Sequence, residues 1–358
     1  MSAHGPTGVE RRSPRVSVVI AVHNGEAHLR AAVASVLRQT MPEFELIVAD
    51  DCSDDSTPSI LASFTDPRLH VIRTDTRSGA GAARNLAIGQ ARGAYIALQD
   101  ADDIAFPNRL ELQTRMLDGR KEKLVVVSTP MVVIDERDRG RGYVEKPSGS
   151  LALRWFLIFY PPLAHAAAMF VRDALGSEAP YENRLTPAED YGLFVRLLAR
   201  GEGDNLTRPL LFYRRHAGQM SRTLRDRQLL RHDEVALRAL AQELPDARLD
   251  RELFSAVWRH VAGLRPEGDA VELGHVYLDL FEAFAARHVG DPQLPEVRRQ
   301  ALSEIARRSL VGGSARGRAR LLGRILDLDP LAVVSAPASL GRMAAHRARW
   351  RLARPPQS

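Results

Sequence analysis

The sequence predicts an α/β fold: a mainly parallel sheet flanked by helices, followed by an α-helical C-terminal region. Two observations indicate the sheet. Short β-branched runs alternate with amphipathic segments through the first hundred residues, and polar or glycine residues follow the runs. This alternation favours parallel strands joined by right-handed crossovers. A third observation indicates the extension, because beyond residue 222 the chain becomes rich in Leu, Ala and Arg at helical spacing.

The first predicted unit is a strand, a turn and a helix. Residues 16–22 (VSVVIAV) form the β-branched run, Asn24 and Gly25 break it, and residues 26–39 carry apolar side chains at helical spacing. The same order then repeats. We expect strands at 44–49, 69–72 and 95–98, and helices at 56–64, 80–91 and 106–117.

The later elements follow from weaker patterns. We expect one strand region at 124–134, a charged loop without regular structure at 137–150, a helix at 188–199 and a strand at 210–213. Helical segments are predicted at 226–244, 251–264 and 272–286. This organisation predicts three parts: a disordered leader (1–15), an α/β domain (16–222) and a helical region with a basic tail (223–358).

Composition places the chain among globular proteins. Of its 358 residues, 45% are hydrophobic and 26% are charged. No uninterrupted apolar stretch reaches the roughly 18 residues that suggest a membrane span. Cys52 is the only cysteine, which excludes an intramolecular disulfide and fits a reducing, cytoplasmic compartment. The leader has no apolar core of a secretory signal.

The net charge of +6 is concentrated at the C-terminus. Residues 301–358 hold 11 arginines against three acidic residues, and five of these arginines surround Trp350. This pattern predicts peripheral contact with anionic lipid at the inner face of the plasma membrane, and a solvated helical end is the alternative. Nucleic acid is disfavoured as a partner, because the charges are not interleaved with stacking aromatic residues.

Polar clusters follow three of the predicted strands: His23 and Asn24, Asp50 and Asp51, and residues 100–103. If these strands are neighbours, all three clusters line one edge of the sheet, which is where parallel sheets bind ligands. The residues alone leave two interpretations of the DADD segment at 100–103. It is either a site for a hard divalent cation or a solvated turn whose last Asp caps the following helix.

Four segments together resemble the family 2 glycosyltransferases, which have the GT-A (Rossmann-like) fold. They are SVVIAVHNGEAHLRAAVASVLRQT, LIVADDCSDDST, GAGAARNLAIGQARGAYIALQDADD and PAEDYGLFVRLLARG, in this order within residues 16–222. The resemblance implies an inverting enzyme that moves a sugar from a UDP-, GDP- or dTDP-linked donor to a glycan or lipid-linked hydroxyl acceptor. It also implies a role in cell-envelope or surface polysaccharide synthesis. Thr223 stands where processive synthases carry Trp, so we expect transfer of a single sugar.

The resemblance assigns roles to individual residues. Asp100 and Asp102 resemble the DxD motif, in which Asp102 would lie closest to Mn²⁺ or Mg²⁺, and His216 would be a second metal or diphosphate contact. Asp190, next to Glu189, would be the general base that deprotonates the acceptor. The expected contacts with the nucleotide sugar are Ala21, Asn24, Glu26, Asp51, Arg84 and Asp100.

Several alternatives remain open at this point. Arg84 can pair with phosphate oxygens or with Asp100. The Glu189–Asp190 pair can cap a helix as well as act in catalysis. Ala21 and His23 replace the usual Pro and Tyr of the family's first motif, and Cys52 replaces a Gly. The alternative functions are a non-catalytic sugar-nucleotide binding or scaffold protein and, less favoured, a nucleotidyltransferase.

Overall fold

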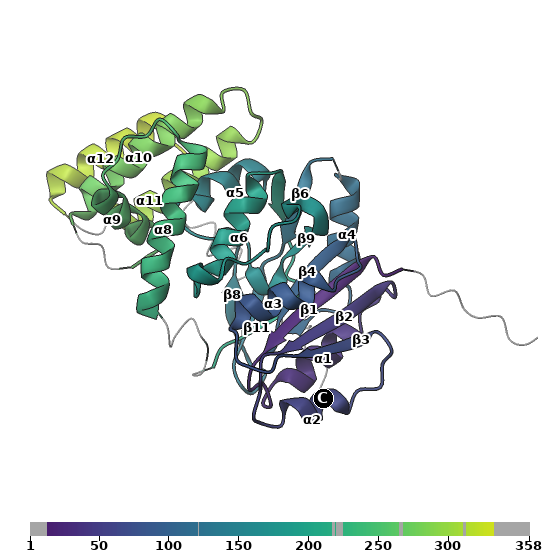
Figure 1. The fold of residues 1–358 in the computed structure, drawn as a ribbon. Helices are drawn as coiled ribbons and strands as arrows, with labels where there is room; N and C mark the ends of the chain where they lie inside the picture. Colours follow the sequence, from purple (N-terminus) through teal and green to yellow (C-terminus); the bar gives the residue numbers. More distant parts are fainter. Residues whose placement is uncertain are drawn as a thin grey trace, which may run out of the picture.

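A computed structural model of the chain describes residues 13–120, 122–216, 219, 225–264, 268–310 and 313–332. Most of the expected leader and the whole basic tail from residue 338 lie outside the described residues. The expected α/β sheet with a helical C-terminal region is confirmed (Figure 1).

The main sheet has seven strands in the order β10-β6-β9-β4-β1-β2-β3. It is mainly parallel, as predicted, and β9 alone runs antiparallel to its two neighbours, β4 and β6. The bounds are β1 (Val16–Val22), β2 (Phe44–Asp50), β3 (Leu69–Arg73), β4 (Tyr95–Asp100), β6 (Leu124–Ser128), β9 (Met169–Val171) and β10 (Glu202–Asn205).

Strand β1 is buried on both faces, which explains its continuous apolar sequence. Val16, Val18 and Ile20 pack in one hydrophobic cluster with residues of α1 (Leu29–Leu37) and α4 (Arg109–Gly119). Val19 points the other way and packs in a second cluster. That cluster includes residues of α3 (Ala80–Gly89), α5 (Ser150–Leu157) and α6 (Glu189–Leu198). Because successive side chains of β1 point to opposite faces of the sheet, the strand packs against helices on both sides.

A second, four-stranded sheet has the order β5-β11-β7-β8. The strand region expected at 124–134 is present, but it forms two strands, because the segment passes from β6 in the main sheet to β7 in the small sheet through Thr129 and Pro130. One expectation was wrong here. The charged segment 137–150 contains a strand, β8, whose residues are at most partly buried and so show no apolar period. The bounds are β5 (Ile104–Ala105), β7 (Met131–Ile134), β8 (Gly140–Val144) and β11 (Leu211–Arg214).

The C-terminal helices gather beside α5 and α6 (Figure 1) and share one hydrophobic core with them. Trp155 of α5 is fully buried there, and its Nε1–H donates to the hydroxyl of Tyr277 at 2.9 Å. Asp250, Asp269 and Ser314 cap the N-termini of three of these helices. The bounds are α8 (Arg225–Glu243), α9 (Arg251–Val261), α10 (Ala270–Arg287), α11 (Leu294–Ser309) and α12 (Ala315–Leu328).

The remaining elements are short: α2 (Thr57–Ala62) and the 3-10 turns η1 (His165–Ala167), η2 (Arg172–Leu175) and η3 (Asn183–Leu185). The apolar segment 151–171 is divided among α5, η1 and β9. In the described part of the chain, none of the helices combines the length and apolar character needed to cross a membrane.

Candidate active site

Three loops meet at the carboxyl edge of the main sheet. Strands β4, β1 and β2 are neighbours and run parallel, so the expectation that their polar ends lie together is confirmed. Ala21 is the register partner of Asp100, which places it beside the acidic cluster. The edge of the sheet therefore brings the first, second and third sequence motifs to one place.

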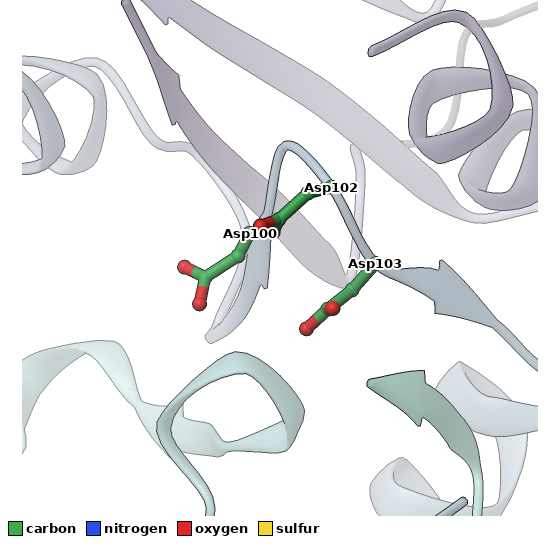
Figure 2. Close-up of side chains that lie close together, drawn as sticks. All are labelled: Asp100, Asp102 and Asp103. Carbon is green, nitrogen blue, oxygen red and sulfur yellow. The ribbon is translucent and has the colours of Figure 1, made fainter. Parts of the chain in front are cut away.

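The acidic cluster lies on the turn between β4 and β5, and Figure 2 shows its three side chains. One carboxylate oxygen from each of Asp100, Asp102 and Asp103 lies within 4.8 Å of the others. Burial and the charge of Asp100 raise the pKa of Asp102. Burial, with Asp102 and Asp100, raises the pKa of Asp103 well above its ordinary value. The cluster is thus an electrostatically unfavourable arrangement that positive charge would relieve.

Asp103 is fully buried, and only one of its two carboxylate oxygens accepts a hydrogen bond. Its Oδ1 accepts from the backbone N–H of Arg214 at 2.9 Å, whereas its Oδ2 has no hydrogen-bond partner among the described residues. The interpretation of Asp103 as a helix cap was wrong, because α4 begins at Arg109 with Asn108 as its N-cap residue. An unpaired buried carboxylate oxygen within a group of three carboxylates fits a hard divalent cation such as Mg²⁺ or Mn²⁺.

His216 reaches this cluster from the end of β11. Its Nε2 lies 2.8 Å from Oδ2 of Asp102, and its ring lies 5.4 Å from the ring of His28. Burial and the nearby Arg214 lower the pKa of His28. The Nε–H of Arg214 donates to the backbone carbonyl of Asp102 at 2.9 Å, which fixes the strand against the acidic turn. His216 can therefore orient Asp102 or join it in holding a cation.

Arg84 connects the acidic cluster to the Glu189–Asp190 pair. Its Nη2 lies 2.8 Å from Oδ1 of Asp100, and its Nη1 lies 4.0 Å from Oε1 of Glu189. Burial opposes ionisation of Asp100, but the charges of Arg84 and His165 outweigh it and lower the pKa of Asp100. Of the two roles expected for Arg84, pairing with Asp100 is present in this structure.

The acidic pair begins α6. Glu189 is only 4% exposed, and burial together with the charge of Asp190 raises its pKa. Asp190 is partly exposed, and its Oδ1 accepts from the backbone N–H of Tyr191 at 2.8 Å. The N-cap residue is Ala188, so neither acid occupies the capping position. The positive end of the helix nevertheless favours a carboxylate here.

Helix α8 supports the segment that leads to Asp190. Arg238 pairs with Glu182 at 3.1 Å, and the side chain of Gln228 donates to the carbonyl of Pro187 at 3.3 Å. The ring of His232 packs 5.3 Å from the ring of Tyr191. The C-terminal helices are therefore part of the structure that positions the acidic pair.

The carboxylate of Asp51 accepts hydrogen bonds from nearby residues of the protein. It accepts from the backbone N–H and hydroxyl of Ser78, from Gly79 N–H and from the hydroxyl of Thr74. Burial opposes its ionisation, but the hydrogen bonds from Ser78 and Gly79 outweigh burial and lower its pKa. Asp51 thus holds the loop before α3. Cys52 next to it has φ 58°, a conformation that favours glycine, which explains the glycine expected there.

Asn24 and Glu26 link the first loop to the second. The side-chain amide of Asn24 donates to Asp54 at 2.6 Å, and a carboxylate oxygen of Glu26 accepts from Ser56 N–H at 3.1 Å. Asn24 has φ 54°, which its short polar side chain tolerates. Both side chains therefore shape the rim of the site.

One residue at the site, Tyr181, carried no expected role in the sequence. The hydroxyl of Tyr181 lies 2.9 Å from Nε2 of His165, and the ring of Tyr181 lies 5.7 Å from the guanidinium of Arg84. Asn85 fixes Tyr181 by two hydrogen bonds to its backbone. No local pattern marks Tyr181, because it follows an irregular segment. His165 lies 3.8 Å from Asp100, so its ring faces the acidic cluster.

We expect His165 to make folding stability depend on pH. Burial and Arg84 lower its pKa to about 4, below the roughly 6.5 of an unfolded His. Between these values the unfolded chain binds a proton that the folded chain does not, so stability falls as the pH drops through this window. The loss is about 3 kcal/mol.

The measurement is urea unfolding at pH 6.5 and 4.5 for the wild type and His165→Gln, which can keep a bond to Tyr181. The variant should lose less stability on acidification than the wild type. Equal losses in the two proteins would show that His165 does not carry this effect.

A parallel-sheet edge with a DxD turn, a facing acidic pair and flanking helices defines a glycosyltransferase of the GT-A type. Residues 17–177 match the family model described as "Glycosyl transferase family 2". The chain is 31% identical over 310 residues to the succinoglycan biosynthesis protein ExoO of Rhizobium meliloti, covering 80% of this chain and 87% of that protein. This chain therefore belongs to glycosyltransferase family 2.

Two further similarities were found. The chain is 39% identical over 102 residues to WfgD of Escherichia coli, a glucosyltransferase named for UDP-Glc and a GlcNAc-diphosphoundecaprenol acceptor. The match covers 28% of this chain and 40% of WfgD. Among solved structures, S. aureus TarS 1–349 in complex with UDP-GlcNAc aligns with a TM-score of 0.56 at 20% identity, covering 91% of this chain and 92% of TarS. At that identity the TarS match supports the fold alone.

Proposed function

We propose that this protein is an inverting, metal-dependent glycosyltransferase that moves a single sugar from a nucleotide diphosphate to a hydroxyl acceptor. The observation that carries the proposal is the connection of two motifs by one side chain. Arg84 pairs with Asp100 of the DxD turn and lies 4.0 Å from Glu189 of the acidic pair. The DxD turn, which would bind the leaving diphosphate, and the acidic pair, which would supply the general base, thus lie on either side of the Arg84 guanidinium.

The acidic cluster would hold the metal. Asp102 and Asp103 supply carboxylate oxygens, and His216 orients Asp102 or adds a nitrogen ligand. When bound, Mn²⁺ or Mg²⁺ would neutralise the charge that develops on the departing diphosphate. Arg84, already beside Asp100, can add a hydrogen bond to a phosphate oxygen.

Asp190 would act as the general base. It takes the proton of the acceptor hydroxyl while that oxygen forms a bond to the anomeric carbon and the bond from this carbon to the diphosphate oxygen breaks. Attack opposite the leaving group inverts the configuration. Glu189, buried and beside Arg84, would fix the start of α6 in place.

The donor would be a UDP-, GDP- or dTDP-linked sugar. Each of these bases presents a ring N–H next to a carbonyl, which a carboxylate such as Asp51 can accept. Ala21, Asn24 and Glu26 line the same loops and would shape the nucleotide site. The names of ExoO and WfgD support a role in surface polysaccharide synthesis, with a glycan or lipid-linked acceptor.

In this proposal residues 16–222 form the catalytic domain and the later helices brace it. The basic tail would hold the enzyme at the inner face of the plasma membrane by contact with anionic lipid. Sedimentation with anionic liposomes, with and without residues 338–358, measures this contact. Equal sedimentation of both proteins would exclude it.

The function is tested by thermal unfolding with UDP, GDP and dTDP, each with and without Mn²⁺ or Mg²⁺. A ligand that binds only the folded protein raises the melting temperature. We expect a metal-dependent rise with one nucleotide, followed by sugar transfer from the matching donor. A rise without turnover on any acceptor would favour the alternative of a non-catalytic binding protein. No rise in folded protein would overturn the proposal.

A further inference from the structure

Lysine is rare in this chain, and one lysine lies near the candidate base. Three of the 50 basic Lys and Arg side chains are lysines, at positions 121, 123 and 146. Lys123 is exposed and position 121 lies outside the described residues, whereas Lys146 is partly buried in the segment between β8 and α5. An ammonium is a compact charge that can lose its proton, which a guanidinium does not do at ordinary pH.

Lys146 is held in a defined place. Its Nζ donates to the carbonyl of Pro161 at 3.3 Å, in the loop that leads to His165. The side-chain amide of Asn205 donates to the carbonyls of Pro147 and Pro162 at 2.7 and 3.1 Å, which joins the two segments. The position of Lys146 is therefore set by the fold as well as by its own hydrogen bond.

The charge of Lys146 lacks a counter-ion in contact. Among the residues that the structure describes, no carboxylate oxygen lies within 4.0 Å of its Nζ. Arginines on neighbouring elements are paired: Arg141 with Asp135 and Arg120 with Asp204. Burial lowers the pKa of Lys146 to about 8, and the charged group that acts against this is Asp190 of α6. A partly desolvated cation without an ion pair is unfavourable until an anion arrives.

We propose that Lys146 binds an oxyanion, a phosphate or carboxylate group, that the acceptor carries close to its reacting hydroxyl. The inference rests on the proposed function, in which Asp190 contacts that hydroxyl. Lys146 is tied to Pro161 in the loop that ends at His165, and His165 lies 3.8 Å from Asp100. An acceptor bound in front of the acidic motifs therefore brings its neighbouring groups towards Lys146. An ammonium has three donors and one is used by Pro161, so two remain for the oxygens of an anion.

The test uses the full chain labelled with [¹³C]lysine, in which three lysines give three sets of Cε signals. Lys146→Arg and Lys123→Met assign them. The protein is titrated without divalent metal with methyl phosphate, with acetate and with methyl glucoside as the neutral comparison. We expect one of the two anions to move the Lys146 signal saturably and to raise the pH midpoint of its titration, because a bound anion stabilises the protonated form. The two anions distinguish a phosphate from a carboxylate acceptor.

Melting temperatures supply the second measurement. The anion should stabilise the wild type and Lys123→Met equally, and should not stabilise Lys146→Met. If the Lys146 signal does not shift with either anion, or shifts no more than the Lys123 signal, the inference is overturned. If Lys146 responds but no nucleotide binds in the metal panel, the oxyanion site stands and the transferase proposal fails. If nucleotides bind and Lys146 does not respond, only the oxyanion site fails.

Discussion

Replacing Asp190 by Asn is expected to lower kcat and kcat/KM together, by about 10²- to 10⁴-fold, without weakening the binding of the donor nucleotide. Asn has the shape of Asp and its oxygen can still accept from Tyr191 N–H, so the start of α6 should not change. What is lost is the ability to take the acceptor proton. Initial rates over a range of acceptor concentrations, with the nucleotide thermal shift measured in parallel, separate these two effects.

A matched control is Asp173→Asn. Asp173 is 85% exposed and pairs at 3.3 Å with Arg172 on the surface, so its loss should leave the rates unchanged. If Asp190→Asn retains wild-type kcat, Asp190 is not the base. If it loses nucleotide binding as well as turnover, Asp190 contributes to the donor site or to folding.

Replacing Asp102 by Ala is expected to abolish the metal-dependent part of nucleotide binding. At a nucleotide concentration of 100 times its Kd, the wild type gains about 2.7 kcal/mol of stability, and the variant should lose most of this gain. Without ligand, the variant should be at least as stable as the wild type. The charge of Asp102 helps to raise the pKa of Asp103, so its removal relieves repulsion between the two.

The variant should keep or gain stability without ligand but lose the stabilisation by metal and nucleotide, and these opposite effects make the prediction specific. A variant that is merely misfolded would melt at a lower temperature without ligand, whereas loss of a metal ligand changes only the response to metal and nucleotide. Glu122→Ala, an exposed acid that precedes β6, serves as the charge-matched control and should respond like the wild type. An unchanged metal-dependent shift in Asp102→Ala would remove Asp102 from the metal site.

Local sequence patterns predicted most of the first half of the fold. Strands β1, β2 and β4 and helices α1, α3 and α4 have clear patterns, because each packs one or two apolar faces in the core of the main sheet. Prediction failed for β8 and for the division between β6 and β7. Strand β8 is polar and lies at the edge of a small sheet, so its conformation depends on pairing with β7, a contact that local propensity does not encode.

The residues of the candidate site likewise fall into those that the sequence predicts and those that only the tertiary structure places. The sequence by itself determined the acidic turn, because Asp100, Asp102 and Asp103 are neighbours in the chain and end a buried strand. The family resemblance suggested His216 and Arg84 for this site, but only the tertiary structure decided how they join the turn: His216 beside Asp102, and Arg84 between the two acidic motifs. The physical reason is that periodicity fixes which face a residue occupies within its own element, whereas strand order and helix packing fix which elements meet. Contacts between residues far apart in the chain, such as His216 and Asp102 with a separation of 114 positions, therefore follow only from strand order and helix packing.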